Sequence, residues 1–131
     1  MDLFIAAQDI GSIHLGLGKN RTVDIEESFS VSPEEYLQTL DRFLKKHAVS
    51  VSSIGSLFVV PGPGSFTASR VSVTLANTMA FALNIPVVCL PNPEKKLLKE
   101  LYNSFPKAEF VEQVFITPLY DRPPNITQAK P

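Results

Sequence analysis

The sequence predicts an α/β fold in which helices flank one mixed sheet. Three short strand patterns come first, and a helix, a strand, a second helix and a further strand follow them. This order predicts an antiparallel meander that continues into parallel strands, because crossover helices join strands that run the same way. A length of 131 residues with 44% hydrophobic content suits a single core. We therefore expect one lobe, with no room for a second full lobe.

The first three strands are expected within residues 3–26. The run from Leu3 to Ala7 is continuously apolar, and the run from Ser12 to Leu17 alternates beside glycines, so together they predict a hairpin. The third run, from Thr22 to Glu26, alternates with a period of two residues. Such alternation is typical of a strand with one buried face and one solvated face.

A helix is predicted next, from an N-cap at Ser32 to about His47. Pro33 and two glutamates fall in its first turn, which is where helices favour these residue types. Its apolar residues recur at helical spacing, at Tyr36, Leu37, Leu40, Phe43 and Leu44.

The remaining elements alternate between strand and helix. The run from Ile54 to Val60 predicts a buried strand, Phe66 to Asn84 a long helix, and Pro86 to Leu90 a strand that is apolar on both faces. A third helix is expected from Pro93 to Phe105, and a last strand at Val114 to Ile116. The proline-rich run at residues 118–124 cannot enter a central strand, so we expect it to be extended on a surface or toward a partner.

The turn before the long helix, residues 61–65, contains two prolines and two glycines. The prolines fix φ and lack an amide N–H, while the glycines permit positive φ or a close backbone approach. The hydroxyl of Ser65 or Thr67 can cap the helix. Free amides at a helix N-terminus also bind anions, so a phosphate or nucleotide site is an alternative to simple packing of the turn. The residues of that candidate site are Gly62, Gly64, Ser65 and Thr67.

The sequence shows no convergent set of acid, base and nucleophile, so we assign no catalytic residue, no metal ligand and no cofactor. His14 and His47 lack further ligands at metal spacing, and we expect His47 to interact with the last carbonyls of its helix. Cys89 is interpreted as a small buried hydrophobe. Four carboxylates could converge but are better explained as solvated groups at strand ends; they are Asp9, Asp24, Glu26 and Glu27.

A net charge of −1 gives no general electrostatic reason to expect direct binding of nucleic acid or of an anionic membrane. The N-terminus lacks a basic region followed by an apolar stretch, and no run approaches about 18 apolar residues. From these observations we expect a cytoplasmic protein without a membrane partner.

The run Gly62 to Arg70 reads Gly-Pro-Gly-Ser-Phe-Thr-Ala-Ser-Arg. It resembles the Gly-Pro-Gly-Ser-Phe-Thr-Gly-Leu-Arg motif of the TsaB (YeaZ) family of bacterial tRNA threonylcarbamoyladenosine synthesis. The tail at residues 118–124 resembles the Tyr-x-Arg-Pro-Pro segment with which many members end. The resemblance implies a single actin-like (ASKHA, ribonuclease H-like) lobe over residues 1–91. Residues 92–131 would then be a short helix and an extended tail in place of the family's second lobe.

The chain departs from the family pattern at two places. The first strand of the family usually ends in Ile-Asp-Thr, whereas this chain continues from Ile5 through two alanines to Gln8 and Asp9. Displacement of this acidic residue argues against phosphoryl chemistry, because it serves metal and nucleotide binding in catalytic members of the superfamily. Ala68 and Ser72 replace small or glycine positions of the motif helix, which would alter how closely another helix packs.

The resemblance implies a noncatalytic partner of a TsaD-like enzyme in N6-threonylcarbamoyladenosine modification at tRNA position A37. A TsaE-like ATPase is implied as a further partner. Small residues on the helix from Phe66 to Asn84 permit one side to cover the sheet and the other to receive a helix from another chain. We expect an interface formed by Phe66, Arg70, Val73, Asn77, Tyr36 and Leu40. The alternatives are a self-associating module that forms a homodimer and a small nucleotide-binding protein that uses the Gly/Pro turn.

Overall fold

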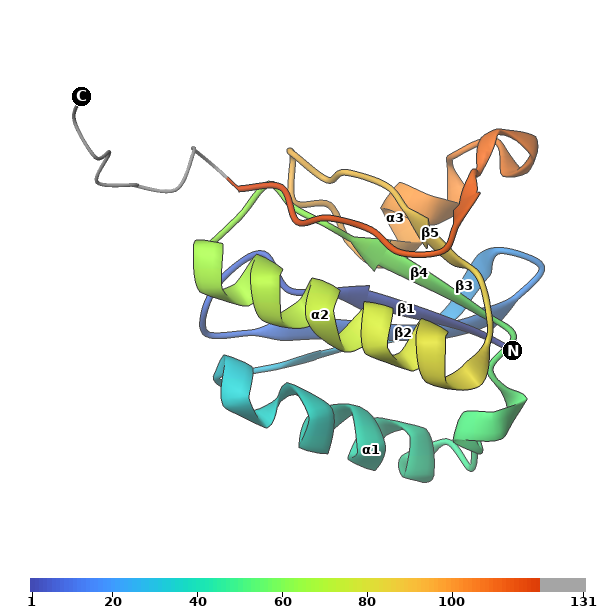
Figure 1. Ribbon diagram of the computed structural model, residues 1–131, viewed down its shortest axis with the longest axis horizontal. Helices are drawn as coiled ribbons and strands as arrows, with labels where there is room; N and C mark the ends of the chain where they lie inside the picture. The colour runs from blue at the N-terminus through green and yellow to red at the C-terminus, as the bar shows by residue number, and fades with distance from the viewer. Residues whose placement is uncertain (121–131) are drawn as a thin grey trace.

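The computed structural model describes residues 1–120 and shows a six-stranded sheet with helices on both faces (Figure 1). The strands are β1 (Asp2–Ala6), β2 (Ile13–Lys19), β3 (Thr22–Phe29), β4 (Ser56–Val60), β5 (Val87–Cys89) and β6 (Glu112–Gln113). The helices are α1 (Tyr36–Lys46), α2 (Phe66–Leu83) and α3 (Leu98–Asn103). Single 3-10 turns cover Pro33–Glu35, Val51–Ser53 and Lys107–Glu109.

The sheet has the order β3-β2-β1-β4-β5-β6. The first three strands pair as an antiparallel meander, and β1 then pairs in parallel with β4, as does β4 with β5. The short β6 closes the edge antiparallel to β5. The predicted mixed sheet, antiparallel first and parallel afterwards, is therefore confirmed.

The two faces of the sheet carry separate hydrophobic cores. Figure 1 shows α1 and α2 side by side on one face and α3 on the other. Leu3 and Ile5 of β1 belong to the core under α1 and α2, whereas Phe4 between them belongs to the core under α3. This division follows from the alternation of side chains along a strand. Both faces are covered, which explains why β1 and β4 read as continuous apolar runs.

Small residues place α2 close to the sheet. The buried face of α2 is made of Ala68, Ser69, Ser72, Ala76 and Ala80, and each is at most 3% exposed. Short side chains let the helix axis approach the strands closely, so the stripe of small residues serves the chain's own sheet. The sequence analysis expected small residues on two sides of this helix. The solvent face of α2 mixes small exposed residues, Thr67, Thr74, Thr78 and Ala82, with three large ones, Phe66, Arg70 and Phe81.

Two predictions for the C-terminal part were wrong. The third helix is limited to α3, because the side chain of Asn92 accepts from the amide of Lys96 and donates to its carbonyl, which closes a loop in place of the first helical turns. The last strand, expected at residues 114–116, lies earlier at Glu112–Gln113. Ile116 is instead bound through its backbone to α2.

Glu27 joins β3 to the end of α1. Its carboxylate accepts a hydrogen bond of 2.6 Å from Lys46 Nζ and lies 2.8 Å from His47 Nε2. The expected contact of His47 with its own helix carbonyls is thus replaced by a contact between its ring and a strand. The hydrogen bonds from Lys46 and then His47 lower the pKa of Glu27 below its ordinary value of 4.5.

This lowered pKa predicts a pH-dependent contribution to stability. A carboxyl group with a lowered folded-state pKa stabilises the fold above pH 4.5, and the contribution is lost as the pH falls through the folded-state value. We expect Glu27→Gln to lower the free energy of unfolding in urea at pH 7 and to have little effect at pH 3. Glu100→Gln, on an exposed residue of α3, is the control. An equal loss at both pH values would contradict the assignment.

Within residues 1–120 no helix is long and apolar enough to cross a membrane.

Candidate partner-binding site

A groove runs between α1 and α2 on the outer side of the helical layer. It has a volume of about 440 Å³ and is lined by Pro33, Glu34, Tyr36, Leu37, Arg70, Val71, Thr74 and Leu75. Leu37 is 64% exposed even though it belongs to the apolar side of α1. Leu75 and Val71 are only partly buried. The groove is therefore largely apolar, with one guanidinium group at its edge.

The solvent face of α2 is unusually apolar. Phe81 is 89% exposed, and Phe66 at the first turn is 41% exposed. Thr74 and Phe81 follow Arg70 by four and eleven residues, which are about one and three helical turns, so the three side chains share one face. The outer face of α2 therefore exposes two aromatic rings and one guanidinium group.

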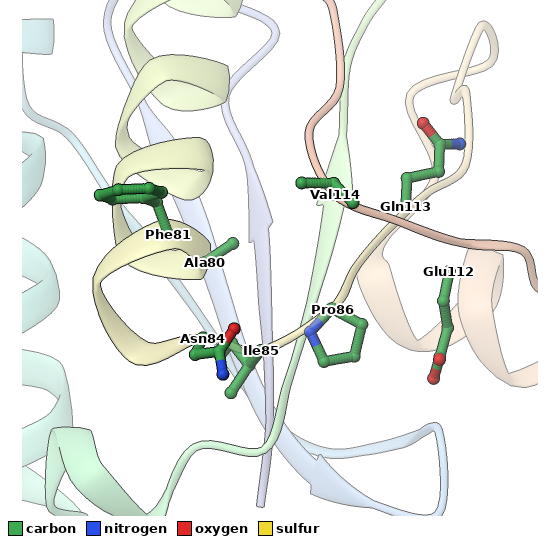
Figure 2. A pocket seen from close by; sticks show the side chains of 8 residues that line it. All are labelled: Ala80, Phe81, Asn84, Ile85, Pro86, Glu112, Gln113 and Val114. Carbon is green, nitrogen blue, oxygen red and sulfur yellow. The ribbon is translucent and has the colours of Figure 1, made fainter.

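A second hollow, of about 480 Å³, lies between the C-terminal end of α2 and the edge of the sheet. Figure 2 shows its lining, with Phe81 and Ala80 from α2 on one side and Gln113 and Val114 on the other. The ring of Phe81 points away from Val114 and Gln113 in this view. Its ring therefore belongs to the outer face of α2 rather than to the interior of the hollow.

Arg70 is positioned by aromatic contacts at the start of α2. Its guanidinium carbon lies 5.5 Å from the centroid of the Phe66 ring, which suits a cation–π contact. The Phe66 ring in turn stacks on Tyr120, with centroids 4.5 Å apart and an angle of 27° between the planes. The structure thus brings together Phe66 and Arg70, two of the predicted interface residues.

The other predicted interface residues are engaged within the chain. Tyr36, Leu40 and Val73 are at most 2% exposed and belong to the core between the helices and the sheet. Their side chains pack on the inner sides of α1 and α2, and Tyr36 also borders the groove. Asn77 uses both atoms of its side-chain amide to bind the backbone of Ile116.

Burial has a chemical consequence for Tyr36. Desolvation, and then the negative charge of Asp9, raise the pKa of Tyr36 to about 12. Its hydroxyl donates to the carbonyl of Ser12 at 3.2 Å, so the ring also joins α1 to the start of β2. Tyr36 is a structural tyrosine in this fold.

The sequence analysis did not identify Phe81 as an interface residue, and it grouped Leu37 with the apolar residues on the packed face of its helix. The signal for Phe81 was present as its spacing of eleven residues from Arg70. It was obscured because α2 has apolar residues around most of its circumference, and such a pattern does not show which side meets the sheet.

The Gly/Pro turn is packed against the chain itself. Gly62 has φ 135°, and a Cβ there would overlap the carbonyl of Leu119. A Cβ on Gly64 would overlap the backbone of Gln8, whose carbonyl accepts from the amide of Ser65 at 2.7 Å. The two glycine faces that could approach an anion are therefore occupied by this chain's own backbone.

Two further residues of the candidate anion site lie at the start of α2. Ser65 caps the helix, since its Oγ accepts from the amide of Ala68 at 3.3 Å, and Thr67 is exposed in the first turn. These positions agree with the packing interpretation of the turn. An anion site would require the turn to move away from Gln8.

The tight contact at Gly64 gives a prediction for stability. Gly64→Ala should lower the free energy of unfolding by about 1–3 kcal/mol, because the added methyl group forces the turn away from Gln8. Thermal unfolding measures the effect. Gly55→Ala is the matched control, since a Cβ at Gly55 meets no atom within 4 Å. Equal melting temperatures for the two variants would show that the turn is not held in this way.

The end of β1 carries a neutral buried amide. Gln8 is 7% exposed, and its Nε2 donates to the carbonyls of Pro63 and Asn92 at 2.8 and 2.6 Å. The side chain of Asn92 donates back to Gln8 Oε1 at 3.1 Å. The neighbouring Asp9 is exposed and lies 2.7 Å from Lys95 Nζ. Gln8 therefore fastens the Gly/Pro turn to the loop at Asn92, while Asp9 lies at the surface.

The four candidate carboxylates do not converge. Glu26 accepts from the amides of Leu98 and Lys99 at the start of α3, and Glu27 binds the end of α1. Among the described residues, no group of three or more His, Cys, Asp or Glu side chains could hold a metal ion. Cys89 is half-buried, and burial raises the pKa of its thiol.

Comparison with known proteins places the chain in a family. The family model described as TsaD, tRNA N6-adenosine threonylcarbamoyltransferase, matches residues 32–109, which is more than half of the chain. The chain belongs to this family. The match covers α1, the Gly/Pro turn, α2 and α3, and so it includes every element of the groove.

Two curated relatives define the likeness further. The tRNA threonylcarbamoyladenosine biosynthesis protein TsaB of Buchnera aphidicola is 33% identical over 86 residues, which are 65% of this chain and 38% of the relative. The tRNA N6-adenosine threonylcarbamoyltransferase of Geotalea daltonii is 29% identical over 85 residues, or 62% of this chain and 25% of the relative. The resemblance to the TsaB (YeaZ) family is confirmed. The chain spans well under half the length of these relatives.

Solved structures support the fold. YeaZ from Pseudomonas aeruginosa superposes with a TM-score of 0.61 at 20% identity, covering 70% of this chain and 43% of that chain. A second structure, of an uncharacterized protein with similarity to peptidase YeaZ from the same organism, has a TM-score of 0.58 at 22% identity. The chain therefore shares the fold of the matched part of YeaZ, in agreement with the predicted α/β lobe with one mixed sheet.

Proposed function

We propose that this chain is a noncatalytic partner protein that binds a TsaD-like enzyme through the outer face of α1 and α2. In this role it supports formation of N6-threonylcarbamoyladenosine at tRNA position A37. The observation that carries the proposal is the outer face of α2, where Arg70 borders the groove and Phe81, about three turns farther along the helix, is 89% exposed. Membership of the family supports the choice of a TsaD-like enzyme as the partner.

The geometry of the groove favours a helix as the element that binds there. Two helices side by side present ridges and grooves into which a third helix packs. Arginine and aromatic side chains commonly carry most of the binding energy of an interface. Arg70, Phe66 and Phe81 supply these types on one face of α2.

The end of β1 supports a noncatalytic role. Gln8 and Asn92 form a buried, uncharged pair directly after β1, where the family resemblance leads us to expect the acidic residue of catalytic superfamily members. The uncharged amide of Gln8 donates two hydrogen bonds to backbone carbonyls and accepts one from Asn92, so it is suited to holding the Gly/Pro turn. Asp9, next to it, is paired with a lysine at the surface.

The proposal also covers the domain organisation of the chain, its location in the cell and a further partner. Residues 1–91 would be the TsaB-type lobe, and residues 92–131 would take the place of the second lobe of the family. The chain would act in the cytoplasm with a TsaE-like ATPase as a further partner. Residues 121–131, which include the rest of the proline-rich run, lie outside the described residues.

The experiment is to mix the chain with the TsaD-like protein of its own source and to measure the mass of the complex by size exclusion with light scattering. A one-to-one complex is the expected result. A chain that elutes only as a monomer or as a homodimer would overturn the proposal, and the homodimer would favour a self-associating module that uses the same face. A rise in melting temperature with added ATP alone would instead favour the nucleotide-binding alternative.

A further inference from the structure

The C-terminal segment Ile116–Tyr120, here called the strap, runs alongside α2 from Asn77 to Phe66. In Figure 1 it is the red segment that runs from β6 past α2 toward the Gly/Pro turn. Ile116 is 3% exposed and belongs to the core under α2. The strap therefore begins as part of the core and ends at the proposed docking face.

Backbone contacts hold the strap along its length. The Asn77 side chain donates to the carbonyl of Ile116 at 2.8 Å and accepts from its amide at 2.9 Å. Farther along, the amide of Leu119 donates to the carbonyl of Pro61 at 2.7 Å. Leu119 also fills the space beside Gly62 that a side chain would occupy. These contacts fix where the next residue, Tyr120, is placed.

Tyr120 contacts the outer face of α2, the proposed partner-binding face, through its aromatic ring. It stacks on Phe66 at 4.5 Å, and Phe66 lies 5.5 Å from the guanidinium carbon of Arg70. Phe66 and Arg70 are exposed on a single turn of α2 and would otherwise sample several rotamers. A stacked ring that restricts them lowers the entropy lost when a partner binds.

We propose that the strap is a component of the partner-binding surface, and that Tyr120 is a positioning residue that holds Phe66 and Arg70 ready for the enzyme. This inference rests on the proposed function. Asn77 contributes to the same arrangement, because its side-chain amide holds the strap at Ile116, the end opposite to Tyr120. The predicted interface residue Asn77 would thus affect binding without touching the partner.

The test measures the Kd for the TsaD-like protein with three variants. Tyr120→Ala removes the stacked ring and should weaken binding about tenfold. Tyr120→Phe keeps the ring and should bind as the unchanged chain does. Phe115→Ala is the matched control, since Phe115 directly precedes the strap and is 64% exposed. Rescue by Tyr120→Phe distinguishes stacking from loss of the hydroxyl.

The outcomes of this test distinguish failure of the strap inference from failure of the proposed function. If Tyr120→Ala binds as tightly as the unchanged chain, the strap inference is overturned while the proposed function stands. If the unchanged chain forms no complex, the proposed function fails, and the inference fails with it. A melting curve accompanies every variant. If Tyr120→Ala melts more than about 5 °C lower, Tyr120→Leu replaces it, because leucine retains apolar cover without the stacked ring.

Discussion

Phe58→Ala is expected to lower the free energy of unfolding by about 3–5 kcal/mol. Phe58 is 1% exposed in the centre of the core under α3. Its ring stacks on Phe4 with centroids 4.7 Å apart, and it meets Tyr102 and Phe110 edge-on at 5.7 and 5.4 Å. Removing it leaves a cavity that these rings cannot fill without moving. Because these rings link α3 to the sheet, the loss of stability should affect the packing of α3 as well as that of β4.

Thermal and urea unfolding measure this effect, and a fall of about 10 °C or more in Tm is expected for a chain of this size. Phe58→Leu is the control, since a large apolar side chain preserves most of the volume and should cost less than about 1.5 kcal/mol. Hydrogen exchange should show α3 exchanging faster than α1 in the alanine variant. A loss below about 1 kcal/mol would show that the aromatic cluster is not the core of this face.

The second large effect is expected on association. Arg70→Ala and Phe81→Ala should each weaken binding to the TsaD-like enzyme by about 1–4 kcal/mol, or roughly 5- to 1,000-fold in Kd. Both side chains are exposed on α2, so their removal should leave the melting temperature nearly unchanged. Titration calorimetry gives the Kd, and a thermal melt of each variant gives the stability.

Lys99→Ala is the matched control for this pair. Lys99 is exposed on α3, on the opposite face of the sheet from α1 and α2. We expect it to bind as the unchanged chain does. If Lys99→Ala weakened binding while Arg70→Ala and Phe81→Ala did not, the docking face would lie on the α3 side, and the assignment to α1 and α2 would be wrong.

The sheet could be predicted from the sequence because its signals are local. The alternation from Thr22 to Glu26 and the apolar runs around Ile5 and Val59 each identify a strand by themselves. The order of elements then restricts the topology, since helical crossovers imply parallel neighbours. Ser65 as the cap of α2 could also be predicted, because its serine, the turn before it and the helix after it are contiguous.

The candidate site depends on contacts between distant residues, and these were not predictable from local pattern. Helical spacing shows that Tyr36, Leu40 and Val73 lie on helix faces, but it does not show that those faces meet the sheet. The pairing of Asn77 with Ile116 spans 39 residues and has no local signal. The shift of the last strand has the same cause, since Ile116 is drawn into the core by α2 rather than by β5.

The two cores of the sheet have a practical consequence for anyone who divides the chain at residue 91. The family resemblance implies a boundary at this point, yet Phe4, Phe58 and Val88 are covered by residues that come later, among them Leu98 and Tyr102. A fragment that ends there would present a broad aromatic surface to water, and such surfaces drive aggregation. Experiments on residues 1–91 alone would then measure solubility instead of partner binding. Fragments for functional work should therefore extend through Tyr120.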